Sequence, residues 1–118
     1  MRLIRQDLAR AVPDDSPIFV GEVLRQNLVA EGDASLLRVT AVTFRGGARN
    51  KLHRHTTDQV LVVTAGRGIV ATEDEHLRVS AGDVVLVPAG ELHWHGAEAG
   101  ADFTHLSILT PGEMTIEE

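Results

Sequence analysis

The sequence predicts an all-β protein, folded as a sandwich or a barrel. Segments rich in Val, Ile, Leu and Thr recur about every 8–12 residues, which is the strand spacing of such folds. Gly- and Pro-containing turn signals separate these segments, whereas a helical period of apolar residues is weak and confined to positions 3–12. The length of 118 residues is that of one domain, and 43% apolar residues suffice for one core.

The first clear strand is expected at residues 36–44, which are rich in β-branched side chains and precede the turn signal Arg45-Gly46-Gly47. Residues 59–64 and 68–72 are the next two expected strands. The short Gly66-Arg67-Gly68 segment between them predicts a hairpin turn.

A short strand is expected at residues 77–80, after a turn at 73–76, and further strands are expected at 84–87 and 103–109. The Pro88-Ala89-Gly90 segment ends the second of these strands, and Pro111-Gly112 stops the last one. We expect the acidic segment 113–118 to be a peripheral arm. Residues 1–118 then form a single domain with its core at about residues 35–110.

The strand at 59–63 is apolar on both faces. Leu61 and Val63 share one face with Gln59, and Val60 and Val62 form the other. A strand with two apolar faces must be covered on both sides. The barrel interior can cover one face, and either residues 1–30 or a second subunit covers the other. We expect a homodimer, with coverage by the same chain as the alternative.

The composition excludes several classes of function. The net charge is −6 and no basic stripe is present, so we expect no nucleic-acid partner. No apolar run approaches the roughly 18–20 residues of a membrane span, and the first residues lack a continuous apolar segment. We therefore expect no membrane partner and a cytoplasmic location. The chain has no Cys, so any metal must be held by nitrogen and oxygen.

All six histidines lie between positions 53 and 105. His53 and His55 form an H-x-H pair with Gln59 four residues later, so all three would share one face of an extended strand. His93 and His95 form a second H-x-H pair, and His105 lies on the last expected strand. Imidazole is the commonest protein ligand for mid-row divalent metals, and an amide can add a neutral oxygen ligand.

Two segments around these histidines resemble the two motifs of the cupin family. Residues 47–66, GARNKLHRHTTDQVLVVTAG, resemble the first motif, G-x5-H-x-H-x3-4-E-x6-G. Residues 82–93, GDVVLVPAGELH, resemble the second, G-x5-P-x-G-x2-H. Gln59 stands where many cupins have Glu, and Ala97 stands where the second motif often ends in Asn. The resemblance implies a cupin barrel, that is, a double-stranded β-helix or jelly roll.

The segments PAGELHWHGA and THLSI, at residues 88–97 and 104–108, narrow the likeness to small single-domain bacterial cupins. This subgroup includes manganese-dependent hydroxynitrile lyases and cupins associated with carboxymuconolactone-decarboxylase-like proteins. The resemblance implies a manganese or iron site, and it implies that the metal ligands are His53, His55, Gln59 and His93. It also implies that His105 lies beside the metal as a candidate general base.

The predicted cofactor is one divalent metal, Mn first, with Fe, Ni, Co and Zn as alternatives. Four neutral ligands would leave its +2 charge intact, which favours Lewis-acid chemistry on a small hydroxy or oxo compound. The leading hypothesis is a lyase similar to the hydroxynitrile lyases, with His105 or His95 moving the proton. An Fe(II)-dependent dioxygenase and a non-catalytic module that binds a small molecule are the alternatives.

The sequence also predicts the positions of four residues that are not proposed metal ligands. Thr40 and Val42 share a face on the strand before the first motif, and they line the substrate pocket if that face looks inward. Trp94 has the opposite parity to the paired histidines, so we expect it on the outer face or in a subunit interface. His76 is expected to be a solvated turn residue.

Overall fold

Twelve strands and one turn of 3-10 helix make up the protein, and the computed structural model describes all of residues 1–118. The 3-10 helix η1 is Leu8–Arg10. The strands are β1 Val12–Pro13, β2 Phe19–Val20, β3 Val23–Val29, β4 Arg38–Phe44, β5 Arg49–Asn50, β6 His53–His55, β7 Gln59–Ala71, β8 His76–Ser80, β9 Val84–Val87, β10 Trp94–Ala97, β11 Phe103–Leu109 and β12 Met114–Ile116. The all-β prediction is confirmed, and the strands at 84–87 and 103–109 have the expected bounds.

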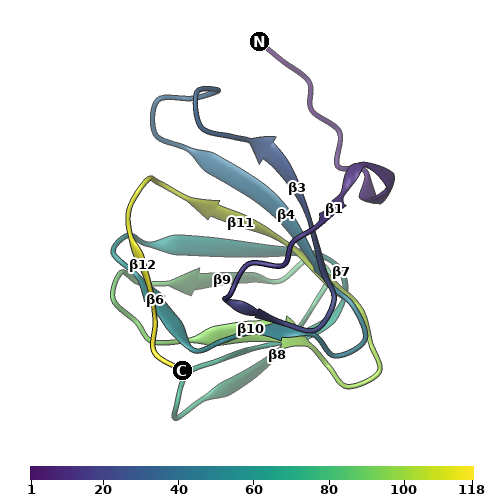
Figure 1. Ribbon diagram of the computed structural model, residues 1–118, viewed down its shortest axis with the longest axis vertical. Helices are drawn as coiled ribbons and strands as arrows, with labels where there is room; N and C mark the ends of the chain where they lie inside the picture. The colour runs from purple at the N-terminus through teal and green to yellow at the C-terminus, as the bar shows by residue number, and fades with distance from the viewer.

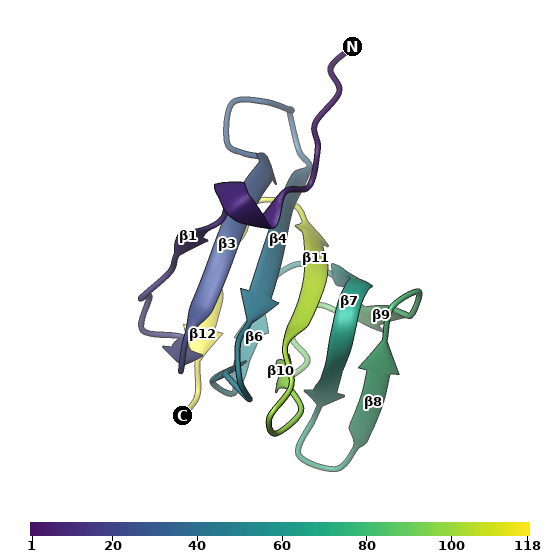
Figure 2. The same ribbon diagram turned by 90° about the vertical axis from the view of Figure 1, so that its right-hand side faces the viewer.

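Ten strands form a curled sheet (Figure 1) in the order β1-β3-β4-β11-β7-β10-β5-β2, with β8 and β9 also paired to β7, and β6 and β12 form a separate two-stranded sheet. All pairings between these strands are antiparallel. The first half of β7 pairs with β11 and β9, and its second half pairs with β8 and β10. Strand β7 therefore runs through both sides of the barrel (Figure 2), and we call these two sides its walls.

The hairpin predicted across Gly66-Arg67-Gly68 is wrong, because β7 runs through this segment without reversing. Gly66 has a φ of +75°, and a Cβ there would collide with the carbonyl oxygen of Asp102. A Cβ at Gly68 would lie against the ring of Phe103. These glycines allow the start of β11 to approach closely, so the strand bends from one wall to the other instead of turning back.

The prediction of a peripheral C-terminal arm is also wrong. Strand β12 pairs antiparallel with β6, the strand that carries the first histidine pair, as Figure 1 shows at the edge of the barrel. The Glu118 carboxylate binds the Arg49 guanidinium through two hydrogen bonds of 3.1 and 2.9 Å and accepts a third from the Leu52 backbone N–H. The acidic tail therefore closes the otherwise unpaired edge of β6.

The N-terminal segment lies along the outside of the barrel (Figure 2). Asp7 caps the 3-10 helix by accepting from the Ala9 N–H. Gln26 on β3 fixes this segment, because its amide accepts from the Asp7 N–H and donates to the Arg5 carbonyl. No helix in the protein has both the length and the apolar character that crossing a membrane requires.

The core lies between the two walls of the barrel. Its buried apolar cluster comprises Val23, Val42, Phe44, Ala48, Leu61, Val63, Val70, Val79, Val87, Ala97 and Phe103. The rings of Phe44 and Phe103 stack with their centroids 5.9 Å apart. Burying one such side chain is worth about 1.5–3 kcal/mol. Phe44 also contacts the rings of His95 and His105, so the apolar core forms the floor beneath the histidines.

Candidate metal centre

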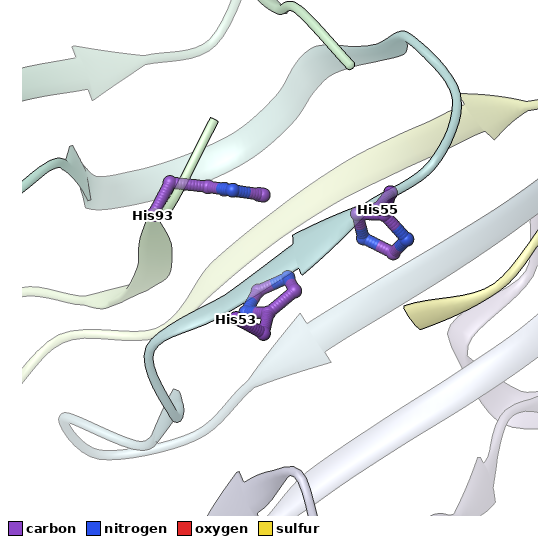
Figure 3. A group of neighbouring side chains, drawn as sticks. All are labelled: His53, His55 and His93. Carbon is purple, nitrogen blue, oxygen red and sulfur yellow. The ribbon is translucent and has the colours of Figure 1, made fainter. Parts of the chain in front are cut away.

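Three histidines from two segments converge inside the barrel. His53 and His55 lie on β6, and His93 lies just before β10, opposite His53 in an isolated bridge (Figure 3). Reciprocal backbone hydrogen bonds of 2.9 Å join His53 and His93, which ties the two segments together. One ring nitrogen from each of the three side chains lies within 4.8 Å of the others. This spacing allows all three imidazoles to bind one ion.

The hydrogen bonds of these histidines leave nitrogen lone pairs free in the shared space. His53 Nδ1 donates to the Lys51 carbonyl at 2.6 Å, and His93 Nδ1 donates to the Glu91 carbonyl at 2.9 Å. A carbonyl only accepts, so the neutral rings carry their lone pair on Nε2. His55 Nε2 is buried and has no hydrogen-bond partner. A buried orphan nitrogen next to two oriented lone pairs fits a bound cation.

Gln59, at the start of β7, contributes an oxygen to the same space. Its Nε2 donates to Ser107 Oγ at 2.8 Å, and this bond turns Oε1 toward His93. Oε1 lies 3.3 Å from His93 Nε2, which already has its proton on the other ring nitrogen. In this orientation two acceptors face each other, an arrangement that a cation bound by both would stabilise. The structure thus places the amide of Gln59 where the sequence predicts a fourth ligand.

Burial keeps these histidines uncharged. It is the largest cause that lowers the pKa of His53, to about 3, and it also lowers the pKa values of His55 and His93. The nearby His93 ring lowers the pKa values of His53 and His55 further. Neutral imidazole is the form that binds a metal ion, so the site is ready to bind at neutral pH.

A cavity of about 130 Å³ opens beside the histidine cluster. The residues that line it are Ile18, Phe19, Val42, Asn50, His53, His55, Gln59, His95, His105, Ser107 and Leu109. No Asp, Glu, Lys or Arg side chain is among them. Of the two predicted pocket residues, Val42 lines this cavity. Thr40 does not, because it lies further along β4, where its hydroxyl contacts the Asn27 amide oxygen at 3.4 Å.

His95 and His105 lie behind the metal cluster as a hydrogen-bonded pair. His105 Nε2 is 2.9 Å from His95 Nδ1, and both residues line the cavity. Both side chains are almost fully buried, and burial is the largest cause that lowers their pKa values, to about 4 for His105. The two predicted proton-moving residues are therefore neighbours, and both are neutral at pH 7.

The remaining histidine and the tryptophan lie outside the site. Trp94 is half-buried on β10, and the Arg49 guanidinium lies 5.9 Å from its ring centroid. His76 is exposed as expected, but it begins β8 and packs edge-on against Trp94 with the centroids 5.7 Å apart. Neither residue lines the cavity, so the prediction of an outward Trp94 agrees with its position.

Sequence reasoning missed several residues of the cavity wall. Ser107 and Leu109 share strand parity with His105, and this parity could have identified both. Ile18 and Phe19 come from the N-terminal half, which carries no motif. Asn50 enters the site because Arg49 on β5 pairs with Gly96 on β10, a long-range contact that the sequence does not indicate.

A family profile for the cupin domain matches residues 40–115. With the barrel and the histidine cluster described above, this match shows that the chain belongs to the cupin family. The structure is also similar to the crystal structure of a cupin-like protein from Thermotoga maritima, with a TM-score of 0.84 and 31% identity, covering 94% of this chain and 90% of that one.

Two curated relatives are enzymes. The chain is 41% identical to an (R)-mandelonitrile lyase from Granulicella tundricola over 91 residues, which are 76% of this chain and 70% of the lyase. It is 36% identical to a gentisate 1,2-dioxygenase from a Ralstonia species over 58 residues, 48% of this chain. That match spans only 16% of the dioxygenase.

Proposed function

We propose that this cupin is a metal-dependent lyase that acts on a small, uncharged hydroxy or oxo compound such as an aliphatic hydroxynitrile. The observation that carries the proposal is the donor set: three imidazoles and one amide converge on one point, and no charged side chain lines the cavity. The similarity to a mandelonitrile lyase over most of the chain supports the same chemistry.

The proposed ligands are His53, His55, Gln59 and His93, and the proposed metal is Mn²⁺. A divalent ion held by four neutral ligands keeps its full charge and supplies strong polarisation of a substrate oxygen. The Lys51 and Glu91 carbonyls and the Ser107 hydroxyl hold three of these side chains in their orientation. Such outer contacts fix the direction of the ligand atoms before an ion binds.

The cavity limits the size and the charge of the substrate. A volume of about 130 Å³ is close to the ~150 Å³ of an engineered apolar cavity that holds benzene. Ile18, Phe19, Val42 and Leu109 provide an apolar wall for the carbon chain and exclude water. The cavity wall has no Arg or Lys, so only the metal ion could pair with a carboxylate on the substrate.

His105 and His95 are the proposed proton-moving pair. Both are neutral, both line the cavity, and a hydrogen bond joins them. A positioned histidine that exchanges a proton with the substrate typically contributes 10²–10⁴-fold to the rate. His105→Ala should therefore lower kcat by about 10²-fold or more while the metal content stays intact. Unchanged rates would rule out this role for His105.

Cyanide release from small aliphatic hydroxynitriles by the Mn²⁺-loaded protein tests the proposal. His53→Ala should lose both bound metal, by elemental analysis, and cyanide release. His76→Ala is the matched control, because it removes an exposed histidine outside the cavity, and it should retain both. A protein that binds one Mn²⁺ per chain and cleaves no small hydroxynitrile would overturn the lyase assignment.

A dioxygenase is the second candidate, and the similarity to part of a gentisate 1,2-dioxygenase favours it. Because the cavity wall has no Arg or Lys, the carboxylate of gentisate would have to bind the metal ion itself. Oxygen consumption by the Fe(II)-loaded protein with gentisate separates the two candidates. Stoichiometric oxygen uptake would favour the dioxygenase, and its absence together with cyanide release would favour the lyase. Binding of a small molecule without either reaction would support the third alternative, a non-catalytic module.

We also propose that the chain forms a homodimer through the outer face of β7, β9 and β11. Val84 and Leu86 on β9 are each 63% exposed. The N-terminal segment reaches only the neighbouring part of this face, where Gln6 donates to Thr64 Oγ1 at 3.2 Å. An uncovered apolar sheet face typically marks a protein interface. The cytoplasmic location expected from the sequence stays a prediction.

A further inference from the structure

A third polar side chain, Asn50, joins the histidine pair behind the cavity. Asn50 lies on β5 and is buried, with 2% of its surface exposed. Its Oδ1 accepts a hydrogen bond of 2.8 Å from the backbone N–H of His95. A backbone N–H only donates, so this bond determines which end of the amide is oxygen.

The fixed amide turns its nitrogen toward the ring of His95. Asn50 Nδ2 lies 3.0 Å from His95 Nε2 and 3.3 Å from His95 Nδ1. An amide nitrogen carries two protons and no lone pair, so it can only donate. The nearer ring nitrogen, Nε2, must then be the acceptor and carry no proton. In neutral His95 the proton is consequently on Nδ1.

This tautomer sets the direction of the next hydrogen bond. His95 Nδ1–H faces His105 Nε2 at 2.9 Å and donates to it. His105 Nε2 therefore carries the lone pair, and the proton of neutral His105 is on Nδ1. That Nδ1 is buried and has no partner in the protein. The His105 residue as a whole is part of the cavity wall.

The opposite direction brings two donors into contact. If His105 Nε2 carried the proton, His95 Nδ1 would accept it, and the proton of His95 would move to Nε2. That N–H would then face the Asn50 amide nitrogen at 3.0 Å, donor against donor. A buried donor without an acceptor costs about 1–3 kcal/mol, so the Asn50 amide disfavours this arrangement.

We propose that Asn50 is a positioning residue that orients the hydrogen bonds of the His95–His105 pair, so that His105 Nε2 accepts from His95 and the proton of His105 lies on Nδ1. The proposal rests on the proposed function, in which this pair moves the proton. In this resting arrangement His105 holds a proton on Nδ1 and cannot take up the substrate hydroxyl proton whose loss releases cyanide. The lone pair of a general base appears at His105 Nδ1 only when the chain of hydrogen bonds reverses.

Asn50→Asp tests the proposal with little change in shape. The carboxylate keeps an acceptor for the His95 backbone N–H but replaces the amide donor with a second acceptor. Long-range ¹H–¹⁵N NMR of histidine side chains, in protein loaded with diamagnetic Zn²⁺, reports which ring nitrogens carry protons. In the unmodified chain, Nδ1 of both His95 and His105 should be protonated and both Nε2 atoms bare. In Asn50→Asp, His95 Nε2 should gain a proton.

A proton on His95 Nε2 in the unmodified chain would overturn the proposal, and this measurement stands even if the variant fails to fold. A bare Nε2 in folded Asn50→Asp would also overturn it. Thr43→Val is the control, since it removes a buried hydrogen bond to Thr104 outside the cavity, and it should leave both tautomers unchanged.

Kinetics provide a second measurement. With the proposed hydroxynitrile substrate, Asn50→Asp should change kcat by about 10²-fold, the lower range of proton-transfer effects, because it moves the proton of the pair, with KM within about twofold. A change confined to KM would contradict a positioning role. If the unmodified protein shows no turnover, the proposed function fails, and the NMR measurement still decides the role of Asn50.

Discussion

Gln59 determines the charge of the candidate metal centre, because the other three proposed ligands are imidazoles. The amide already has a defined orientation, with Nε2 bonded to Ser107 and Oε1 directed at His93. A carboxylate at this position would have nearly the same shape but would neutralise one unit of the charge of the ion. Residue 59 therefore sets a balance between metal affinity and polarising power.

Gln59→Glu should bind Mn²⁺ more tightly than the unmodified chain and turn over the substrate about tenfold more slowly. The added negative charge attracts the ion. It also weakens the polarisation of the substrate oxygen, and a tenfold slower rate corresponds to an activation barrier higher by about one kcal/mol. Titration calorimetry and cyanide release measure the two effects. Gln26→Glu, on the outside of the barrel, is the control. Weaker metal binding by Gln59→Glu would contradict the ligand assignment.

The buried histidines make stability of the metal-free chain depend on pH. In the unfolded chain a histidine binds a proton below its usual pKa of 6.5, whereas burial lowers the pKa of His105 in the folded chain to about 4. Between these values the unfolded state holds more protons. The stability is therefore complete above pH 6.5 and falls as the pH drops toward 4, by about 1.4 kcal/mol per unit for each such histidine.

Urea unfolding of the metal-free chain between pH 7.5 and about 4.5 measures this slope. His105→Gln removes one buried titrating group and should flatten the slope. His76→Gln changes an exposed histidine and should leave it as it is. Equal slopes in the two variants would show that His105 is not the neutral buried group that the structure describes.

At the scale of elements, strand β12 stabilises the two segments that carry or precede the three proposed histidine ligands, β6 and β10. Met114 and Ile116 pair with His55 and His53, so the edge of β6 is closed along its whole length. Arg49, which binds Glu118, also pairs with Gly96 and stacks over Trp94 on β10. The C-terminal residues thus connect β6 and β10 from the outside of the barrel.

Deletion of residues 113–118 should lower both thermal stability and metal affinity. The deletion exposes the edge of β6, so that His53 and His55 lose the backbone support that holds their spacing. We expect a fall in Tm of about 4–8 °C for each kcal/mol lost and a Mn²⁺ affinity at least about tenfold weaker. Glu118→Gln is the milder control, since it keeps the strand. Unchanged affinity after deletion would show that β6 needs no support from β12.

The sequence predicted correctly those strands whose ends are marked by nearby Gly and Pro residues. Strands β9 and β11 lie between Gly and Pro residues, and the H-x-H spacing placed His53 and His55 on one face of a strand. The two wrong predictions of the fold, the hairpin at residues 66–68 and the peripheral C-terminal arm, both depend on long-range contacts. The glycines at 66 and 68 match a hairpin turn, but their actual role is close approach to Asp102 and Phe103, which lie far along the chain.

In the candidate site, too, local patterns predicted some residues correctly, and residues that depend on long-range pairing were missed. The motif spacing predicted the four proposed ligands, and strand parity explains Val42 on the cavity wall. Asn50 carries no local signal, because its contact with His95 depends on pairing between β5 and β10. Thr40 has the parity of Val42, but parity alone does not indicate how far along the strand the cavity extends.

At the scale of the whole molecule, the first half of β7 and its neighbours β9 and β11 form a sheet whose outer face is apolar. Val60 and Val62 pair with Leu86 and Val84 on β9, and they pair with Ile108 and Leu106 on β11. All six side chains point away from the buried face that holds Leu61 and Val63. Because a two-fold axis pairs a surface with itself, one such patch is enough to form a symmetric dimer.

Leu86→Glu should convert the proposed dimer to a monomer at micromolar concentration, because two carboxylates would then face an apolar interface. Sedimentation velocity measures the mass. Leu36→Glu is the matched control, since Leu36 is 62% exposed on a loop away from this face, and it should remain dimeric. The metal site lies inside one chain, so the monomeric variant should still bind one Mn²⁺. A monomeric unmodified chain would show that the N-terminal segment and solvent suffice to cover this face.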